Sequence, residues 1–218
     1  MRIKNLAYTL TIVMLPALAN AQSAPKTFDL KASPPTVHRG FFDASLKPVL
    51  TIDSGDIVRL ETVSGNPRWF EKLGVPKDKI PSELPEQFPY DYLPVHVAGA
   101  LLSVGDGHAV QGHGEVSLSA VETSLKGEIQ VVLHKNRRLR WPRAETATHY
   151  ITMGLDPDLD QAAKIATSEM LDLLVETRGL SRDEVYLLAS AAMDLIVTQV
   201  VDGTKGVHAM MPKAIFQK

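Results

Sequence analysis

Apolar residues recur at helical spacing through a long segment in the second half of the chain. Within residues 159–174 they stand at Leu159, Ala162, Ala163, Ala166, Met170, Leu173 and Leu174, which is the period of one helix face. Gly179 stands where a C-terminal cap is expected. The following Ser181-x-x-Glu184 is a capping box, and it predicts a second helix with an apolar stripe running as far as Ile196. A strand over residues 197–201 and a glycine-bearing loop over residues 202–208 follow.

The first half of the chain shows the period-two pattern of β-strands. Residues 48–52 and 56–62 predict two strands, and the Asp53-Ser54-Gly55 between them is typical of a hairpin turn. Residues 115–122 alternate between apolar and polar, and residues 129–134 predict another strand. Residues 71–92 have little periodicity and predict a loop. We therefore predict a mixed β and α+β fold, in which a β-sandwich-like N-terminal part (residues 22–135) precedes an α+β C-terminal part (residues 136–218) with two helices.

A glycine-rich passage within residues 93–121 concentrates polar side chains between apolar runs. It holds Asp106, His108, Gln111, His113 and Glu115, with glycines at 105, 107, 112 and 114. Glycine allows backbone turns that other residues resist, so such a loop lets polar side chains converge. Asp106, His108 and Glu115 are suitable ligands for a divalent metal ion such as zinc. The spacing alone leaves open whether they bind a metal or only cap turns.

A second polar cluster, Asp202, Lys205 and His208, lies in the segment VVDGTKGVH. An acid, an amine and an imidazole on one loop could contact a substrate carbonyl or orient metal ligands. Glu122, seven residues after Glu115, is predicted to lie on the opposite face of a regular strand. An exposed charge at the strand end is at least as good an interpretation of Glu122 as a catalytic role.

Four long segments resemble one known family. LPVHVAGALLSVGDGHAVQGHGEV is similar to the signature of the acetamidase/formamidase family, and LRWPRAETATHYITMGLDPDLD, VTQVVDGTKGVHAMMPKAIF and VHRGFFDASLKPVLTIDSGDIVRLET continue the likeness in the family's order. The resemblance implies a metal-associated hydrolase of short linear amides. His113 stands where the family pattern more often has Asp. The chain also runs from LPEQFPYDY directly into LPVHV, without the family's Gly-Asn-Met-Asp-like passage, so we expect a member shortened internally near residues 72–92.

Two functional hypotheses follow from this resemblance. In the first, metal-activated water attacks a formamide- or acetamide-like carbonyl. Glu115 is then the general acid/base or a ligand, Asp106 and His108 are ligands, Lys205 or His208 stabilises the oxyanion, and Gln111 and Asp202 contact the substrate. In the second, the chain is a catalytically impaired or non-enzymatic remnant of an amidase fold. The absent Gly-Asn-Met-Asp-like passage distinguishes the two hypotheses. If no other segment supplies equivalent ligands, the enzyme hypothesis fails.

Composition and the N-terminal sequence indicate where the protein is located and which partners it lacks. Arg2 and Lys4 precede an apolar run and then Ala19-Asn20-Ala21, the pattern of a secretory signal peptide. We expect cleavage after Ala21, which changes the formal charge from −2 to −4 because two positive charges are lost. The chain has no cysteine, which excludes disulfides and a cysteine nucleophile. Without a basic face it predicts no nucleic-acid partner. We expect an exported protein, periplasmic or secreted, that forms homo-oligomers and does not associate with a membrane after cleavage.

Overall fold

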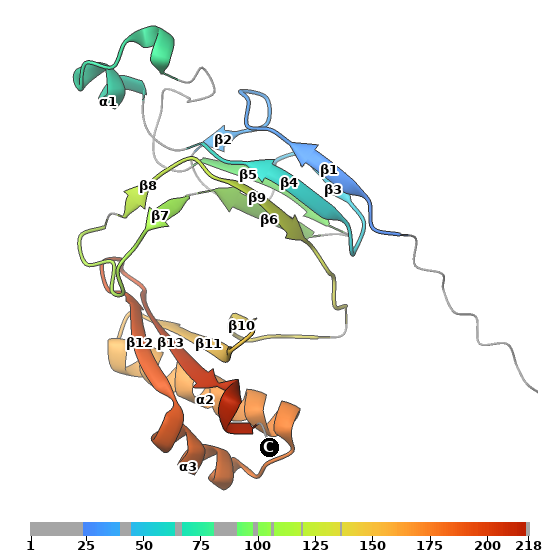
Figure 1. Ribbon diagram of the computed structural model, residues 1–218, viewed down its shortest axis with the longest axis vertical. Helices are drawn as coiled ribbons and strands as arrows, with labels where there is room; N and C mark the ends of the chain where they lie inside the picture. The colour runs from blue at the N-terminus through green and yellow to red at the C-terminus, as the bar shows by residue number, and fades with distance from the viewer. Residues whose placement is uncertain are drawn as a thin grey trace, which may run out of the picture.

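The computed structural model describes residues 24–39, 45–63, 67–80, 91–97, 100–105, 107–118, 120–135 and 137–216. A β part and an α+β part lie one above the other, with the pair of strands β7 and β8 reaching from the first toward the second (Figure 1). Within the described residues, no helix combines the length and the apolar character needed to cross a membrane.

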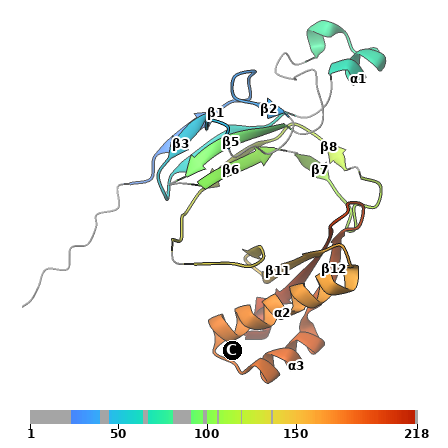
Figure 2. The same ribbon diagram turned by 180° about the vertical axis from the view of Figure 1, so that it is seen from behind.

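The β part consists mainly of two packed sheets. One has the order β1 (Thr27–Leu30), β4 (Ile57–Glu61) and β9 (Lys126–Gln130), with β1 parallel to β4 and β9 antiparallel to it. The other has the order β2 (His38–Arg39), β5 (Asp91–Val97) and β3 (Leu50–Ile52), and β6 (Ala100–Gly105) also pairs with β5. Figure 2 shows the two sheets from behind. Their facing side chains form one apolar cluster around Leu30, Ile52, Val58 and Leu60, so the predicted sandwich-like arrangement is confirmed.

The predicted hairpin at residues 53–55 is wrong, although both of its strands exist. β3 pairs in parallel with β5, whereas β4 pairs with β1 and β9. The turn therefore carries the chain from one sheet to the other. The Asp56 carboxylate accepts hydrogen bonds from the backbone N–H groups of Lys26 and Asp53, both at 2.9 Å. These bonds hold the pKa of Asp56 below its ordinary value and fix the corner between the sheets.

The segment predicted as a loop, residues 71–92, holds the last two residues of a short helix, α1 (Pro67–Lys72), and all of another, η1 (Lys77–Lys79). The last two residues of the segment belong to strand β5. Residues 81–90, part of the region where we expect the family's missing passage, lie outside the described part of the chain.

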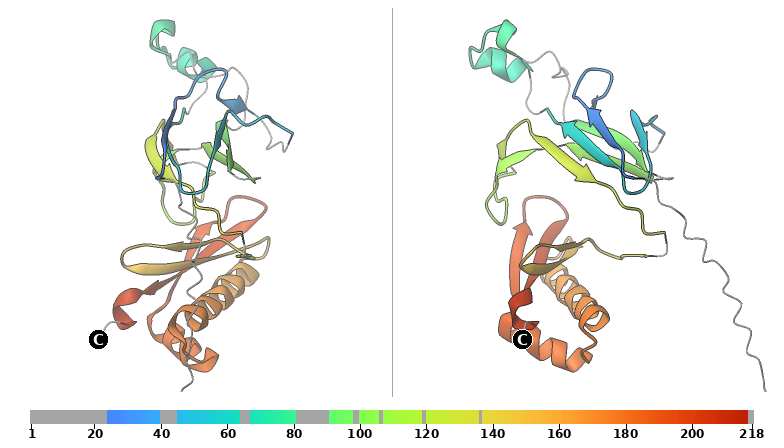
Figure 3. Two further views of the ribbon diagram at one scale, coloured as in Figure 1. Left: turned by 90° about the vertical axis from the view of Figure 1, so that its right-hand side faces the viewer. Right: turned by 45° about the vertical axis from the view of Figure 1, so that its right-hand side comes forward.

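The α+β part is a four-stranded antiparallel sheet covered by helices on one face. The strand order is β10 (Arg143–Glu145), β11 (His149–Asp156), β13 (Lys205–Pro212) and β12 (Asp194–Gln199), and η2 (Lys213–Phe216) follows β13. Helix α2 (Leu159–Arg178) lies across the sheet, and α3 (Arg182–Ala192) packs beside it (Figure 3). The buried hydrophobic residues of this layer are Ala162, Ala166, Met170, Leu171, Leu173, Leu174, Val185, Ala189, Val207, Ala209 and Met211.

Both predicted helices and their caps are confirmed. The Asp158 side chain caps the start of α2 by accepting from Asp160 N and Gln161 N. Gly179 ends α2 in the left-handed conformation, at φ 66°. The Ser181–Glu184 capping box opens α3 with both of its reciprocal bonds.

The boundaries after α3 differ from the prediction. The helix ends at Ala192, and Ile196 belongs to strand β12. Lys205 and His208, predicted on a loop, lie in strand β13. The β-branched run Ile196-Val197-Thr198 favours a strand over a helix, and pairing on both edges of β13 extends that strand backward to Lys205.

Candidate functional site

The glycine-rich passage forms a compact turn. Strand β7 (His108–Val110) pairs with β8 (Val121–Glu122), and residues 111–118 connect them. The strand predicted over residues 115–122 is therefore wrong except for its last two residues. Glu115 and Leu118 have φ values of 40° and 60°, a left-handed conformation that costs a non-glycine residue about 1–3 kcal/mol. Residues with such backbone φ values cannot continue a strand. Backbone strain of this kind is concentrated at functional sites.

Three predicted site residues form a hydrogen-bonded row in this turn. His108 Nδ1 lies 2.8 Å from Gln111 Oε1, and Gln111 Nε2 donates to Glu115 Oε2 at 3.2 Å. An ionised carboxylate only accepts hydrogen bonds, so the amide must present its NH₂ group to Glu115 and its oxygen to His108. His108 therefore carries a proton on Nδ1. The row fixes the ring of His108 and the carboxylate of Glu115 at opposite ends of one amide.

The turn is attached to the α+β part by backbone hydrogen bonds. Gly114 N donates to Thr198 O at 3.1 Å, and Val200 N donates to Gly114 O at 2.9 Å, so Gly114 pairs with Gln199 like a parallel strand. Gly114 has a φ of 94°, which a residue with a Cβ resists. These contacts bring the His113 ring to within 5.7 Å of the His208 ring, centroid to centroid. Residues almost a hundred positions apart thereby meet at one place.

His208 is oriented by its neighbour on β12. Its Nδ1 atom lies 2.7 Å from Thr198 Oγ1. Burial lowers the pKa of His208 below its ordinary value, and the nearby His113 lowers it further. The lowered pKa favours the neutral imidazole, which can donate a proton at one ring nitrogen and accept one at the other.

The second predicted cluster does not converge. Lys205 and His208 are three positions apart on β13 and so lie on opposite faces of the sheet. Lys205 shares the face of Val207 and Ala209, which pack under the helices, and its ammonium donates to Pro157 O at 3.0 Å. Asp202 is exposed, and its backbone N–H donates to Gln199 Oε1 at 3.2 Å. Of the three residues, the structure brings only His208 to the 111–118 turn.

Asp106 lies outside the described residues, so its predicted role as a ligand stays a prediction. The described part of the chain contains no group of three or more His, Cys, Asp or Glu side chains arranged to hold a metal ion. It does reveal a pair that the sequence patterns missed. His108 and Glu122 are opposite each other on β7 and β8, with His108 Nε2 3.5 Å from Glu122 Oε1. The face predicted for Glu122 assumed a regular strand from Glu115, and a turn separates the two residues instead.

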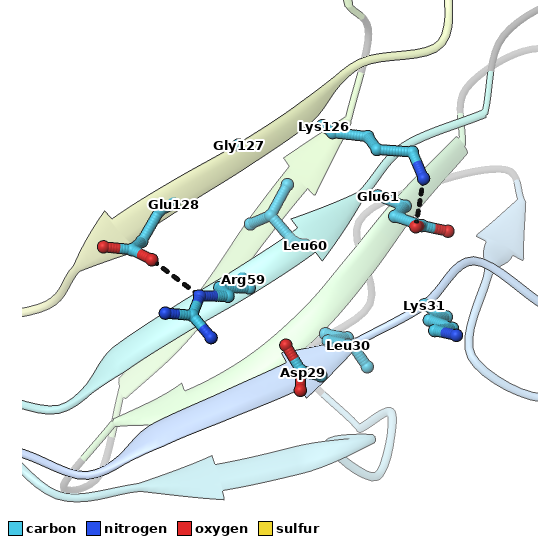
Figure 4. A pocket seen from close by; sticks show the side chains of 9 residues that line it. All are labelled: Asp29, Leu30, Lys31, Arg59, Leu60, Glu61, Lys126, Gly127 and Glu128. Atoms are coloured by element: carbon cyan, nitrogen blue, oxygen red, sulfur yellow. Dashed lines mark hydrogen bonds and ion pairs between the residues drawn. The ribbon is translucent and has the colours of Figure 1, made fainter.

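A shallow hollow of about 400 Å³ lies on the outer face of the β1–β4–β9 sheet. Figure 4 shows the charged side chains that line it. Arg59 Nε lies 2.8 Å from Glu128 Oε2, and Lys126 Nζ lies 2.7 Å from Glu61 Oε1. Four of the charged side chains in the hollow are therefore paired with each other across the strands.

Comparisons with known proteins agree on one family. Solved structures with the same fold include an acetamidase from Yersinia enterocolitica (TM-score 0.67, 21% identity, 92% of this chain and 96% of that chain covered). A protein described as a predicted acetamidase/formamidase from Thermoanaerobacter tengcongensis gives a TM-score of 0.68 at 20% identity, covering 88% and 98% of the two chains. An acetamidase from Bacillus halodurans gives 0.63 at 20% identity, covering 85% and 98%.

No curated protein matches the chain. The model of the acetamidase/formamidase family, however, matches residues 90–218, which is more than half of the chain and includes every residue of the site described above. The resemblance seen in the sequence is thereby confirmed, and the chain belongs to the acetamidase/formamidase family.

Proposed function

We propose that this chain hydrolyses the carbon–nitrogen bond of short linear amides at a site made by His108, the 111–118 turn and His208. The observation that carries the proposal is the row His108–Gln111–Glu115, held against β12 and β13 by the Gly114–Thr198 hydrogen bond. Membership of an amidase family supports amide hydrolysis as the general chemistry. Formamide and acetamide are the substrates that the family resemblance implies.

Glu115 is the proton carrier in this proposal. Its carboxylate accepts a proton from the attacking water, whose oxygen forms a bond to the amide carbon. The same proton then passes to the amide nitrogen as the carbon–nitrogen bond breaks, which releases ammonia and a carboxylic acid. Gln111 holds the carboxylate through its NH₂ group. Because both ends of the Gln111 amide are engaged inside the turn, we assign it an orienting role in place of the substrate contact predicted for it.

His208 is the group proposed to stabilise the developing oxyanion. In the tautomer whose Nδ1 accepts from the Thr198 hydroxyl, the proton stands on Nε2 and can be donated to a carbonyl oxygen. A donor fixed before the reaction is worth several kcal/mol in a water-limited site. Lys205, the alternative donor from the sequence, is committed to Pro157 on the other sheet face.

The family resemblance implies a divalent metal ion, for which the described residues of the turn offer His108 but no group of three ligating side chains. With Nδ1 protonated, His108 presents the Nε2 lone pair, and a neutral imidazole nitrogen is a usual zinc ligand. We propose that His108 and Asp106 hold the ion. When bound, it would polarise the carbonyl and lower the pKa of a bound water.

The test is ammonia release from formamide and acetamide by the full chain with added zinc. We expect turnover that Glu115→Gln lowers by about 10²–10⁴-fold, the range for losing a positioned acid/base. Glu128→Gln is the matched control, since Glu128 is an exposed carboxylate on β9, paired with Arg59 away from the turn. Absence of turnover in the unaltered chain would favour the remnant hypothesis. Equal turnover by Glu115→Gln would remove Glu115 from the mechanism.

A further inference from the structure

The outer face of the β1–β4–β9 sheet carries charges of alternating sign. Side chains alternate along a strand, and Leu30 and Leu60 are buried in the core. The residues on either side of them therefore point outward, toward the hollow (Figure 4). Strand register arranges the charged side chains in two rows that cross the sheet. The first row is Asp29, Arg59 and Glu128, and the second row is Lys31, Glu61 and Lys126.

The two rows have opposite orders of charge. The first row is negative, positive and negative from β1 to β9, and the second is positive, negative and positive. The hydrogen bond from Lys126 lowers the pKa of Glu61, and the charge of Lys31 lowers it further. Each row therefore interacts as a unit. The positive and negative charges of the face are equal in number, so the face does not favour a strongly charged partner such as a nucleic acid.

Asp29 and Lys31 differ from the other four charged residues. Those four form the two cross-strand ion pairs described above. Within the described part of the chain, neither Asp29 nor Lys31 forms an ion pair, and both are exposed. They lie at the edge of the sheet, because β1 is its outermost strand. A negative and a positive charge two positions apart are thus open to a partner.

Two copies of this face complement each other. A two-fold axis parallel to the rows and midway between them lays the first row of one copy over the second row of the other. Asp29 and Lys31 of one copy then face Lys31 and Asp29 of the second copy, and the charges on β4 and β9 oppose each other in the same way. An interface with two-fold symmetry needs a surface that complements itself. We propose that this sheet face binds the same face of a second copy of the chain, forming a two-fold dimer.

The expected dimer is weak and sensitive to salt. The face consists of three strands of four to five residues, fewer than the roughly 20–30 residues per side of a tight interface. Exposed ion pairs each contribute little. Salt screens them, since the Debye length falls from about 10 Å at 0.1 M to about 3 Å at 1 M ionic strength. The dimer should therefore form at high protein concentration in low salt and dissociate in high salt.

Two charge variants test the pairing, with sedimentation equilibrium of the full chain in low salt as the measurement. Asp29→Lys and Lys31→Glu should each weaken self-association at least about tenfold, because each turns two attractive contacts between copies into two repulsive ones. An equimolar mixture of the two variants should associate again, since lysine at 29 then faces glutamate at 31, and Lys31 faces Asp29. Lys164→Glu makes the same charge change at an exposed position on α2 and is the matched control. Circular dichroism checks that every variant is folded.

The recovery in the mixture depends on the proposed contact and not on net charge alone. A monomeric unaltered chain at every concentration in low salt would overturn the inference. Dimerisation through another face would leave both variants as associated as Lys164→Glu, and this result would also overturn it. A mixture that associates no more strongly than either variant alone would show that residues 29 and 31 do not face each other. Ammonia release plays no part in these measurements, so the inference and the proposed function can fail independently.

Discussion

Replacing Gly154 by Ala tests how tightly helix α2 is seated on its sheet. Gly154 lies in β11 beneath α2, and an added Cβ would stand 2.0 Å from Ala162 O and 2.6 Å from Ala166 N. Both neighbouring atoms are helix backbone, so no side-chain rotation can relieve the clash. Ordinary contact needs about 3.4 Å, which requires α2 to move away by roughly 1.4 Å.

A shift of that size removes most of the packing between helix and sheet. Ala162, Ala166, Met170 and Leu174 are fully buried at this contact. A gap of 0.5–1 Å already forfeits a quarter to a half of the dispersion energy of each contact, and overpacking a core costs about 1–3 kcal/mol or more. The Gly→Ala exchange also adds about 0.5–1 kcal/mol to the free energy of unfolding, because it lowers the conformational entropy of the unfolded chain. We therefore expect Gly154→Ala to lower the free energy of unfolding by about 2 kcal/mol or more.

Two other strand glycines provide matched controls. A Cβ at Gly127 in β9 would meet nothing within 4 Å, and one at Gly206 in β13 would meet only side-chain atoms, the nearest at 3.3 Å. Urea unfolding followed by circular dichroism should show Gly127→Ala and Gly206→Ala within about 1 kcal/mol of the unaltered chain. A loss for Gly154→Ala no larger than that for Gly206→Ala would refute the close seating of α2.

Three further predictions concern charge and processing. Glu169→Gln should lower the free energy of unfolding by about 1.5–3 kcal/mol in urea titrations, because Glu169 is 2% exposed and the exchange removes one of the two carboxylates that pair with the nearly buried Arg143, leaving only Glu176. A loss under about 1 kcal/mol would contradict this. Because burial lowers the pKa of His208, its contribution to stability is complete above the ordinary value of about 6.5 and is lost as the pH falls through the lower folded-state pKa. Between pH 7 and pH 5, the free energy of unfolding of His208→Asn should therefore fall less than that of the unaltered chain. Parallel curves of unfolding free energy against pH would contradict a lowered pKa of His208. Intact-mass measurement of exported protein should give a chain that begins at Gln22, and retention of residues 1–21 would refute the signal peptide.

Local signals explain why the helices were predictable and the turn was not. The caps of α2 and α3 depend on residues at most four positions apart, such as Ser181 and Glu184, so the sequence alone determines them. The alternation over residues 115–122 is equally local, yet the segment turns there because Gly114 pairs with Gln199. The hydrophobic pattern of the turn does not reveal a pairing partner that lies eighty-five positions away in the sequence.

The candidate site divides in the same way. The clustering of His108, Gln111 and Glu115 among glycines is a property of the sequence, and so is the likeness of that passage to an amidase family. The row of hydrogen bonds among them follows from four- and three-residue spacing.

Only the tertiary structure decided which distant residues join the site. His208 reaches the turn because its strand parity points it away from α2, whereas Lys205 on the same strand faces the helices. Glu122 meets His108 because β8 pairs with β7 after a strained turn. The physical reason is that residue type and hydrophobic period determine the chemistry of a side chain and the helix or strand that it joins. Strand register and sheet face, which long-range pairing sets, determine which distant side chain it contacts.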